Sequence, residues 1–172
     1  MKAIMISINK PHTDNIFSGK KTNEWRTRPL PLGKAYVYET KHGGGCGKVI
    51  GEMEIVKTYR FHTDDLIWQS TFLEMGCVPY NFVRKYANGK EYISANIIAN
   101  VKKYDTPKEL GEFVKPSNGC CNEGKCKGCK FLDIGIDGII EDDCSAEFDT
   151  DSYSIVKRPP QSWFYCNEFD EV

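Results

Sequence analysis

The sequence lacks an excess of charge of either sign, a long hydrophobic run and any internal repeat. Its 172 residues carry 23 Lys and Arg against 24 Asp and Glu, a formal net charge of −1. Proteins that coat duplex DNA nonspecifically need many phosphate contacts, so this balance argues against that class. No apolar run approaches the roughly 20 residues of a membrane span, and the first ten residues lack the apolar core and cleavage site of a signal peptide. We therefore expect a cytoplasmic protein with no membrane partner.

The charges that are present are divided along the chain. The stretch EDDCSAEFDTD at 141–151 is acidic, whereas residues 10–28 are basic. A local basic patch is therefore compatible with the nearly neutral total. The length suffices for one compact core and is short for two, so we expect a single domain over 1–172, with a cysteine-rich insertion at about 115–145.

Short β-branched apolar runs predict a largely β architecture. The predicted strands cover residues 2–8, 35–40, 48–61 and 91–104. A closing strand is predicted at 163–166, because Pro159 and Pro160 just before it bar a helix.

Helical patterns lie between these strands. Two helices are predicted at 64–75 and 80–87. Thr13 is the predicted cap of a short helix after the first strand. Thr106, Pro107 and Glu109 resemble the capped first turn of another short helix. Strands and helices together predict the α+β class.

The stretch SGKKTNEWRTR concentrates four cations around one Glu and one Trp. If it is extended, its side chains alternate, so Thr22, Glu24 and Arg26 share one face while Trp25 anchors the other. One interpretation is a solvated strand face with a Glu–Arg pair. The other is a cleft for an anionic ligand, in which Lys21 and Arg26 hold a phosphate or a base edge and Glu24 accepts a hydrogen bond or acts as a base.

Cysteines cluster in KPSNGCCNEGKCKGCKF, and Cys144 follows fifteen residues after Cys129. Cys-x2-Cys spacing lets two thiolates converge on one ion, so we predict a structural zinc site, with free thiols or a redox pair as the alternatives. The predicted ligands are Cys121, Cys126, Cys129 and Cys144. Cys120 is an alternative to Cys121. An all-thiolate site is closed and therefore structural rather than catalytic.

The remaining cysteines and all three histidines stand apart from this cluster. They are Cys46, Cys77, Cys166, His12, His42 and His62. We expect small buried or loop thiols, and imidazoles with surface or satisfied polar roles, none of them bound to metal.

Four stretches occur in order over most of the chain. They are MISINKPH, GKKTNEWR, KVIGEMEI and RPPQSWFYCNE. In this combination the chain resembles the ASCH domain, a member of the PUA-like superfamily, and in particular the longer bacterial and phage ASCH proteins with a cysteine-rich insert. The resemblance implies a small mixed β-barrel flanked by helices, with a zinc-knuckle-like insertion. It also implies a cleft where the first helix and the Lys-Thr-x-Glu-x-Arg strand meet the barrel.

The same resemblance implies a function. PUA-like domains typically bind RNA or modified bases, so the chain is expected to be a module that binds RNA or a modified nucleotide. Some ASCH proteins hydrolyse N4-acetylcytidine and another is a ribonuclease, so the alternative is a hydrolase with Lys21 and Glu24 as catalytic residues. The amidohydrolase branch has a threonine where Glu24 stands here, which puts that mechanism in doubt.

Further residues are predicted to line the same cleft. The expected ligand-binding residues are Ser7, Lys10, Thr22, Arg26, Tyr38 and Thr40. Aromatic side chains could stack on a base, although strand aromatics at alternating positions usually pack in the core. The candidates for stacking are Trp25, Tyr36, Tyr38 and Trp163.

Overall fold

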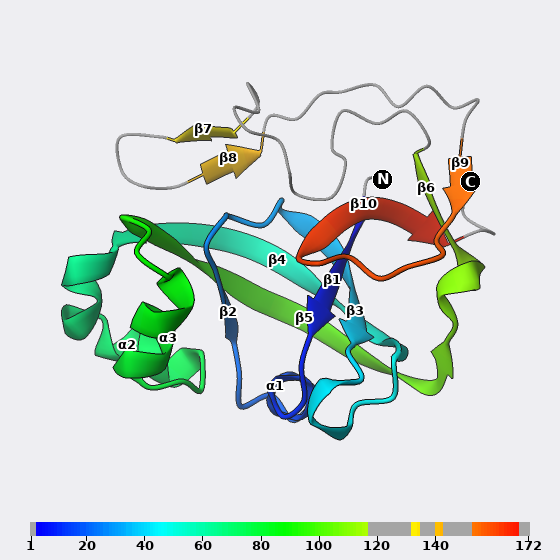
Figure 1. Ribbon diagram of the computed structural model, residues 1–172, viewed down its shortest axis with the longest axis horizontal. Helices are drawn as coiled ribbons and strands as arrows, with labels where there is room; N and C mark the ends of the chain where they lie inside the picture. The colour runs from blue at the N-terminus through cyan, green and yellow to red at the C-terminus, as the bar shows by residue number, and fades with distance from the viewer. Residues whose placement is uncertain (1–2, 117–131, 135–139, 143–152, 169–172) are drawn as a thin grey trace.

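The computed structural model describes residues 3–116, 132–134, 140–142 and 153–168 (Figure 1). The predicted zinc ligands lie outside these residues. They are Cys121, Cys126, Cys129 and Cys144. The zinc site therefore stays a prediction.

Strands dominate the described chain. They are β1 (Ala3–Ile8), β2 (Asn23–Arg26), β3 (Gly33–Glu39), β4 (Lys48–His62), β5 (Tyr92–Lys108), β6 (Phe113–Pro116), β7 (Leu132–Ile134), β8 (Ile140–Asp142), β9 (Tyr153–Ile155) and β10 (Trp163–Glu168). The α-helices are α1 (His12–Phe17), α2 (Ser70–Met75) and α3 (Tyr80–Ala87). Short 3₁₀ helices are η1 (His42–Gly44), η2 (Thr63–Trp68) and η3 (Leu110–Glu112). This mixture confirms the α+β class.

Eight of the described strands form one mixed sheet, in the order β2-β5-β4-β3-β1-β10-β6-β9, and β7 pairs with β8 separately. Neighbours in the large sheet are antiparallel except β1 and β3. The parallel pair arises because α1 and β2 carry the chain back before β3 begins, as a parallel pairing requires. This crossover places α1 and β2 beside the carboxyl end of β1.

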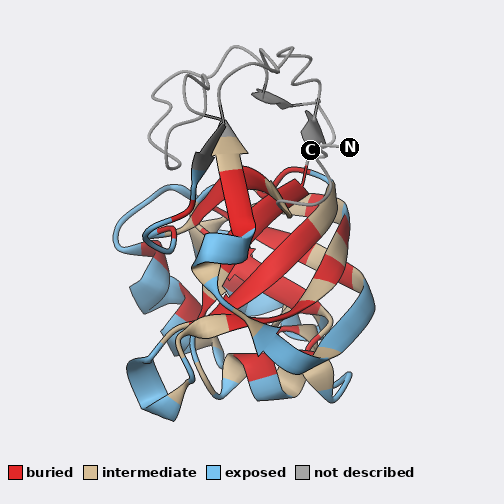
Figure 2. Ribbon diagram, turned by 90° about the vertical axis from the view of Figure 1, so that its right-hand side faces the viewer, coloured by how far each residue is buried: buried red, intermediate tan, exposed pale blue. Residues whose placement is uncertain are grey.

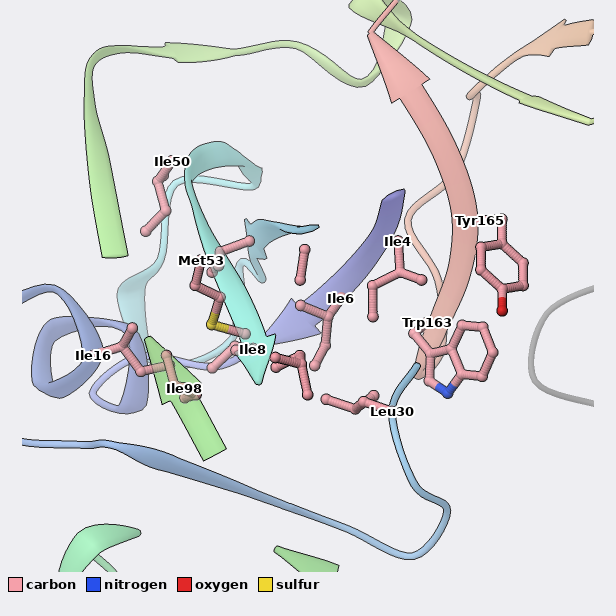
Figure 3. Close-up of a cluster of buried hydrophobic side chains, with 13 residues drawn as sticks. Ile4, Ile6, Ile8, Ile16, Leu30, Ile50, Met53, Ile98, Trp163 and Tyr165 are labelled. Carbon is pink, nitrogen blue, oxygen red and sulfur yellow. The ribbon is translucent and has the colours of Figure 1, made fainter. Parts of the chain in front are cut away.

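The main core lies against one face of this sheet (Figure 3). Ile4, Ile6 and Ile8 of β1 meet Met53 of β4 and Tyr165 of β10 in a single buried cluster. Ile16 of α1 and Ile98 of β5 join the same cluster. Side chains from five strands can converge in this way only if the sheet curves around them. Figure 2 shows the result, with buried residues running along the strands.

The curved sheet corresponds to the expected barrel wall. Within the described residues its pairings end at β2 on one side and β9 on the other. No described pairing joins these two edges, so within the described residues the barrel wall is a strongly curved open sheet.

Helices α2 and α3 lie together at one end of the long strands β4 and β5 (Figure 1). Trp25 of β2 packs there in a second cluster with Leu66, Val83 and Ile93, so the anchoring role predicted for Trp25 is confirmed. None of the described helices is long and apolar enough to cross a membrane.

Two predicted helix caps are wrong. Residues 106–108 continue β5, whose register against β4 jumps from Lys103–Gly51 to Lys108–Val49. Pro107 lies in the resulting bulge, where a missing N–H costs no ladder hydrogen bond. The capped turn lies just beyond, at η3, where Glu109 and a second Glu form the capping box.

Thr13 likewise does not cap α1. Pro11 occupies the cap position, and no side chain caps it. The buried Thr13 hydroxyl instead donates to Glu39 Oε1 at 2.7 Å, and the second oxygen of Glu39 accepts from the Cys46 N–H at 2.8 Å. Burial alone would raise the pKa of Glu39, but these hydrogen bonds hold the pKa below its ordinary value. Thr13 therefore ties α1 to the end of β3, and Glu39 in turn holds the loop that follows.

Candidate functional site

Strand β2 is held at the edge of the sheet by backbone and side-chain contacts. It pairs with β5, with Glu24 opposite Asn96. The fully buried Asn96 amide donates to the Glu24 carbonyl at 2.8 Å, while its oxygen accepts from Leu30 N–H and the Thr58 hydroxyl. These contacts fix the backbone from which Glu24 and Arg26 project.

A pocket of about 560 Å³ opens beside β2, and we call it the main pocket. Its volume falls in the range of about 300–1,000 Å³ that is typical of small-molecule sites. His12, Lys21, Glu24 and Arg26 form its charged floor. Val78, Phe82, Val83 and Tyr86, on or just before α3, form its apolar wall. The pocket therefore combines a polar side and an apolar side in a space of small-molecule size.

Three residues of the charged floor, Lys21, Glu24 and Arg26, form a buried ion network. Lys21 Nζ lies 3.2 Å from Glu24 Oε2, and Arg26 Nη2 lies 3.1 Å from Glu24 Oε1. The three side chains are 2%, 11% and 9% exposed, so they are not a solvated strand face. Two cations share one carboxylate, which leaves one positive charge in excess.

Both cations also hold backbone carbonyls from distant parts of the chain. Lys21 Nζ donates to the Gly76 carbonyl at 2.7 Å, and Arg26 Nη2 donates to the Ser7 carbonyl at 2.7 Å. Gly76 follows α2 and Ser7 belongs to β1. The two cations therefore fix the turn before the apolar wall and the end of β1 relative to β2.

Glu24 is ionised in this setting. Burial alone would raise the pKa of its carboxyl, but the charges of Lys21 and Arg26 outweigh burial and hold the pKa below its ordinary value. A carboxylate of lowered pKa is a poor proton carrier near neutral pH and a good hydrogen-bond acceptor. This favours a ligand-holding role for Glu24 over the proton-transfer role considered from the sequence.

His12 is a pocket residue that sequence reasoning missed. Its ring packs against Phe82, with 5.9 Å between ring centroids, and its Nδ1 is buried without a hydrogen-bond partner among the described residues. Burial and the charge of Lys21 lower the pKa of His12. The only sequence signal was its position in the KPH stretch that opens the first helix.

The structure brings together part of the predicted ligand-binding set. Ser7, Tyr38 and Thr40 line the main pocket with Lys21, Glu24 and Arg26. Ser7 and Tyr38 are neighbours in the parallel β1–β3 pair. The Ser7 hydroxyl also donates to the Pro160 carbonyl at 2.7 Å, so Ser7 joins the last loop to the pocket rim.

Two predicted residues do not line the pocket. Lys10 lies 3.9 Å from Asp14 at the surface. Thr22 serves through its backbone, because its N–H donates to Met75 O and its carbonyl accepts from Ile98 N–H. Tyr36 and Trp163 are buried in the core clusters, so stacking on a ligand is excluded for them by packing.

The apolar wall was also missed from the sequence. Phe82 and Tyr86 are 50% and 41% exposed and stand four residues apart on α3, so they share one helix face. The signal available in the sequence was the spacing of two aromatic residues four positions apart in the predicted helix. Nothing in the sequence placed that face opposite β2.

The described residues provide no metal cluster. No group of three or more His, Cys, Asp and Glu side chains among them is placed to hold an ion. Cys46 and Cys77 are free thiols, and Cys166 is buried in a core cluster.

A curved mixed sheet, crossed over by α1 and β2 to form one side of a pocket, is the architecture of a PUA-like domain. No model of a known protein family and no curated protein sequence matches the chain. Among solved structures, the ASCH protein of Zymomonas mobilis is 26% identical and matches over 63% of this chain and 73% of its own, with a TM-score of 0.54. Two single-substitution variants of that protein match with the same TM-score, at 26% and 25% identity. The chain therefore has the PUA-like ASCH fold, which confirms the resemblance seen in the sequence.

Proposed function

We propose that the chain binds RNA or a modified nucleotide in the main pocket. The observation that carries this proposal is the opposition of a buried charged floor and an aromatic wall within about 560 Å³. A nucleotide has the matching chemistry, because it joins an anionic phosphate and polar base edges to a flat ring. The ASCH-like fold is consistent with nucleic-acid ligands.

Each side of the pocket has a role in this proposal. The excess positive charge of Lys21 and Arg26 attracts the phosphate. The ionised Glu24 accepts a hydrogen bond from an amino group or ring N–H of the base. Phe82 and Tyr86 stack on the ring, an interaction that contributes about 1–3 kcal/mol per base.

The test is binding of short single-stranded RNAs, the four nucleoside 5′-monophosphates and N4-acetylcytidine, measured by calorimetry. Phe82→Ala and Tyr86→Ala should each weaken binding by about 5- to 150-fold, the fold-change equivalent of the lost stacking. Trp68→Ala is the matched control, because Trp68 is 80% exposed on η2 and does not line the pocket. Lack of binding by the wild type, or equal losses in all three variants, would overturn the proposal.

Salt provides a second measurement on the same samples. With one positive charge in excess, affinity should fall only about threefold per phosphate contact between 50 and 200 mM salt. A much steeper dependence would indicate a broad electrostatic surface rather than a pocket.

A hydrolase is the second candidate function. The observation that favours it is that Lys21 and Glu24, the catalytic pair expected from the resemblance, meet inside the pocket, with Lys21 Nζ 3.2 Å from Glu24 Oε2, a distance at which a proton could pass between them. The same binding assays, followed by chromatography of the ligands, distinguish the two functions. Turnover of N4-acetylcytidine or RNA that is abolished in Lys21→Gln would establish the enzyme, whereas binding without turnover would leave the module.

A further inference from the structure

His12 has an unusual environment for a neutral side chain in a ligand pocket. It is the first residue of α1 and forms part of the charged floor of the main pocket. One face of its ring packs on Phe82. Its Nδ1 has no solvent contact and no partner among the described residues. A buried polar atom without a partner costs stability, so the hydrogen bonding of this ring is incomplete in the free protein.

Charged groups approach His12 from several elements. Lys21, Glu24 and Arg26 act on it from β2 and the turn before it. The other titratable or charged residues of the pocket are Tyr38, Lys41 and Tyr86, while Asp14 lies on α1 and Lys10 just before it. Lys21 and Arg26 oppose a positive charge on the ring, whereas Glu24 favours it. The carboxylate is already engaged by both cations, so it compensates the ring only in part.

We propose that His12 is a ligand-binding residue that takes up a proton from solvent when an anionic group enters the main pocket. The inference rests on the proposed function. An anion near Lys21 and Arg26 neutralises the charge that keeps the ring neutral. The resulting imidazolium has two N–H donors, one of which donates to an oxygen of the ligand. The same phosphate then compensates both the excess charge of the two cations and the charge of the ring.

Proton uptake on binding fixes the direction of the pH dependence. The pKa of His12 is below its ordinary value in the free protein and rises when the anion is present. Between these two values, affinity increases as pH falls, because only the complex holds the extra proton. At pH well above the higher value the proton is absent from both states, and affinity is constant.

The probes are the RNA homodinucleotides UpU, CpC, ApA and GpG, because a phosphodiester does not titrate between pH 5.5 and 8. Calorimetry in two buffers of different ionisation enthalpy gives the number of protons taken up. The wild type should take up a measurable fraction of one proton at pH 6 and bind at least about threefold more tightly there than at pH 7.5.

Two substitutions separate the proton from the packing. His12→Phe keeps a ring against Phe82 but has no nitrogen, and His12→Gln keeps a donor that cannot titrate. Both should lose the proton uptake and the pH dependence, and His12→Phe should bind at least about tenfold more weakly at pH 6. His62→Gln is the control, because His62 lies on the other side of α3 in a separate surface groove. Thermal unfolding of each variant checks that it is folded.

The outcomes are distinct. Binding by the wild type without proton uptake, or uptake that persists in His12→Gln, overturns this role of His12 and leaves the proposed function standing. Binding of no dinucleotide by the wild type overturns this role of His12, and it overturns the proposed function as well if the monophosphates and N4-acetylcytidine also fail to bind. Uptake lost in the two His12 variants and kept in His62→Gln supports the inference.

Discussion

Replacing Glu24 by Gln removes the negative charge that compensates two buried cations. In the wild type, Lys21 and Arg26 each lie within 3.2 Å of a Glu24 oxygen, and none of the three side chains is more than 11% exposed. Removing one partner of a buried ion pair costs about 3–5 kcal/mol, because the remaining charge stays buried. Each cation keeps a backbone carbonyl as acceptor, and Gln keeps one oxygen, so we expect a loss near the lower limit, about 3 kcal/mol.

The assay is urea unfolding at pH 7 under reducing conditions, followed by tryptophan fluorescence. Urea unfolding gives the loss of about 3 kcal/mol directly. In a thermal melt of a chain of this length, the same loss would lower the melting temperature by roughly 6–12 °C. The control is Glu91→Gln, since Glu91 is 67% exposed and lies near the surface His62; its free energy of unfolding should change by less than about 0.5 kcal/mol.

The pH dependence tests the electrostatic cause. Because the pKa of Glu24 is lowered in the folded protein, the carboxylate stabilises the fold fully above its ordinary pKa, and this contribution is lost as pH falls. The difference between wild type and Glu24→Gln should therefore be smaller at pH 4 than at pH 7. A cost below about 1 kcal/mol at pH 7, or a difference that grows at pH 4, would refute the view that the network is a compensated buried cluster.

Two further predictions concern other parts of the chain. A Cβ on Gly76 would lie 2.6 Å from the buried Trp25 Nε1, so Gly76→Ala should lower the free energy of unfolding by about 1–3 kcal/mol. Gly111→Ala is the control, because a Cβ there meets no atom within 4 Å and should not lower the free energy of unfolding. Urea unfolding of both variants measures the difference. The predicted zinc site should give about one equivalent of zinc in metal analysis of the purified protein, and substitution of its cysteines by serine should remove the metal, whereas less than half an equivalent in the wild type would count against the site. The cysteines to replace are Cys121, Cys126, Cys129 and Cys144.

The sequence predicted the elements whose signals are local. The alternation in SGKKTNEWRTR correctly places Trp25 in the cluster under α3 and Glu24 and Arg26 at the pocket. Trp25 lines the pocket as well, which the alternation did not predict. The strands that became β1, β3, β4 and β10 were predicted within one or two residues, because each is a run of apolar or alternating residues bounded by turn residues.

The rest of the site depends on contacts between distant segments. Lys21 donates to the carbonyl of Gly76, 55 residues away in the chain, and Arg26 donates to the carbonyl of Ser7, 19 residues away. The periodic patterns of single helices and strands cannot predict such contacts. His12 shows the same limit, because a lone histidine after a proline has no local signal for burial beside a cation. Thr13 was predicted as a helix cap from its local sequence, but its hydroxyl donates instead to the buried carboxylate of Glu39, which lies 26 residues away in the chain.

The charged cluster links the construction of the pocket to its chemistry. Lys21 and Arg26 each use one contact to hold a wall of the pocket, at Gly76 and at Ser7, and one contact to share Glu24. A ligand anion would compete with Glu24 for the same two cations. Its binding free energy is therefore coupled to the positions of β1 and of the turn before α3, because any shift of either cation also changes a backbone contact.

For this reason a fall in affinity after substitution of Lys21 or Arg26 cannot by itself identify a ligand contact. The side chains of Phe82, Tyr86 and His12 hold no backbone carbonyl among the described hydrogen bonds. Substitutions at these residues therefore separate ligand recognition from folding.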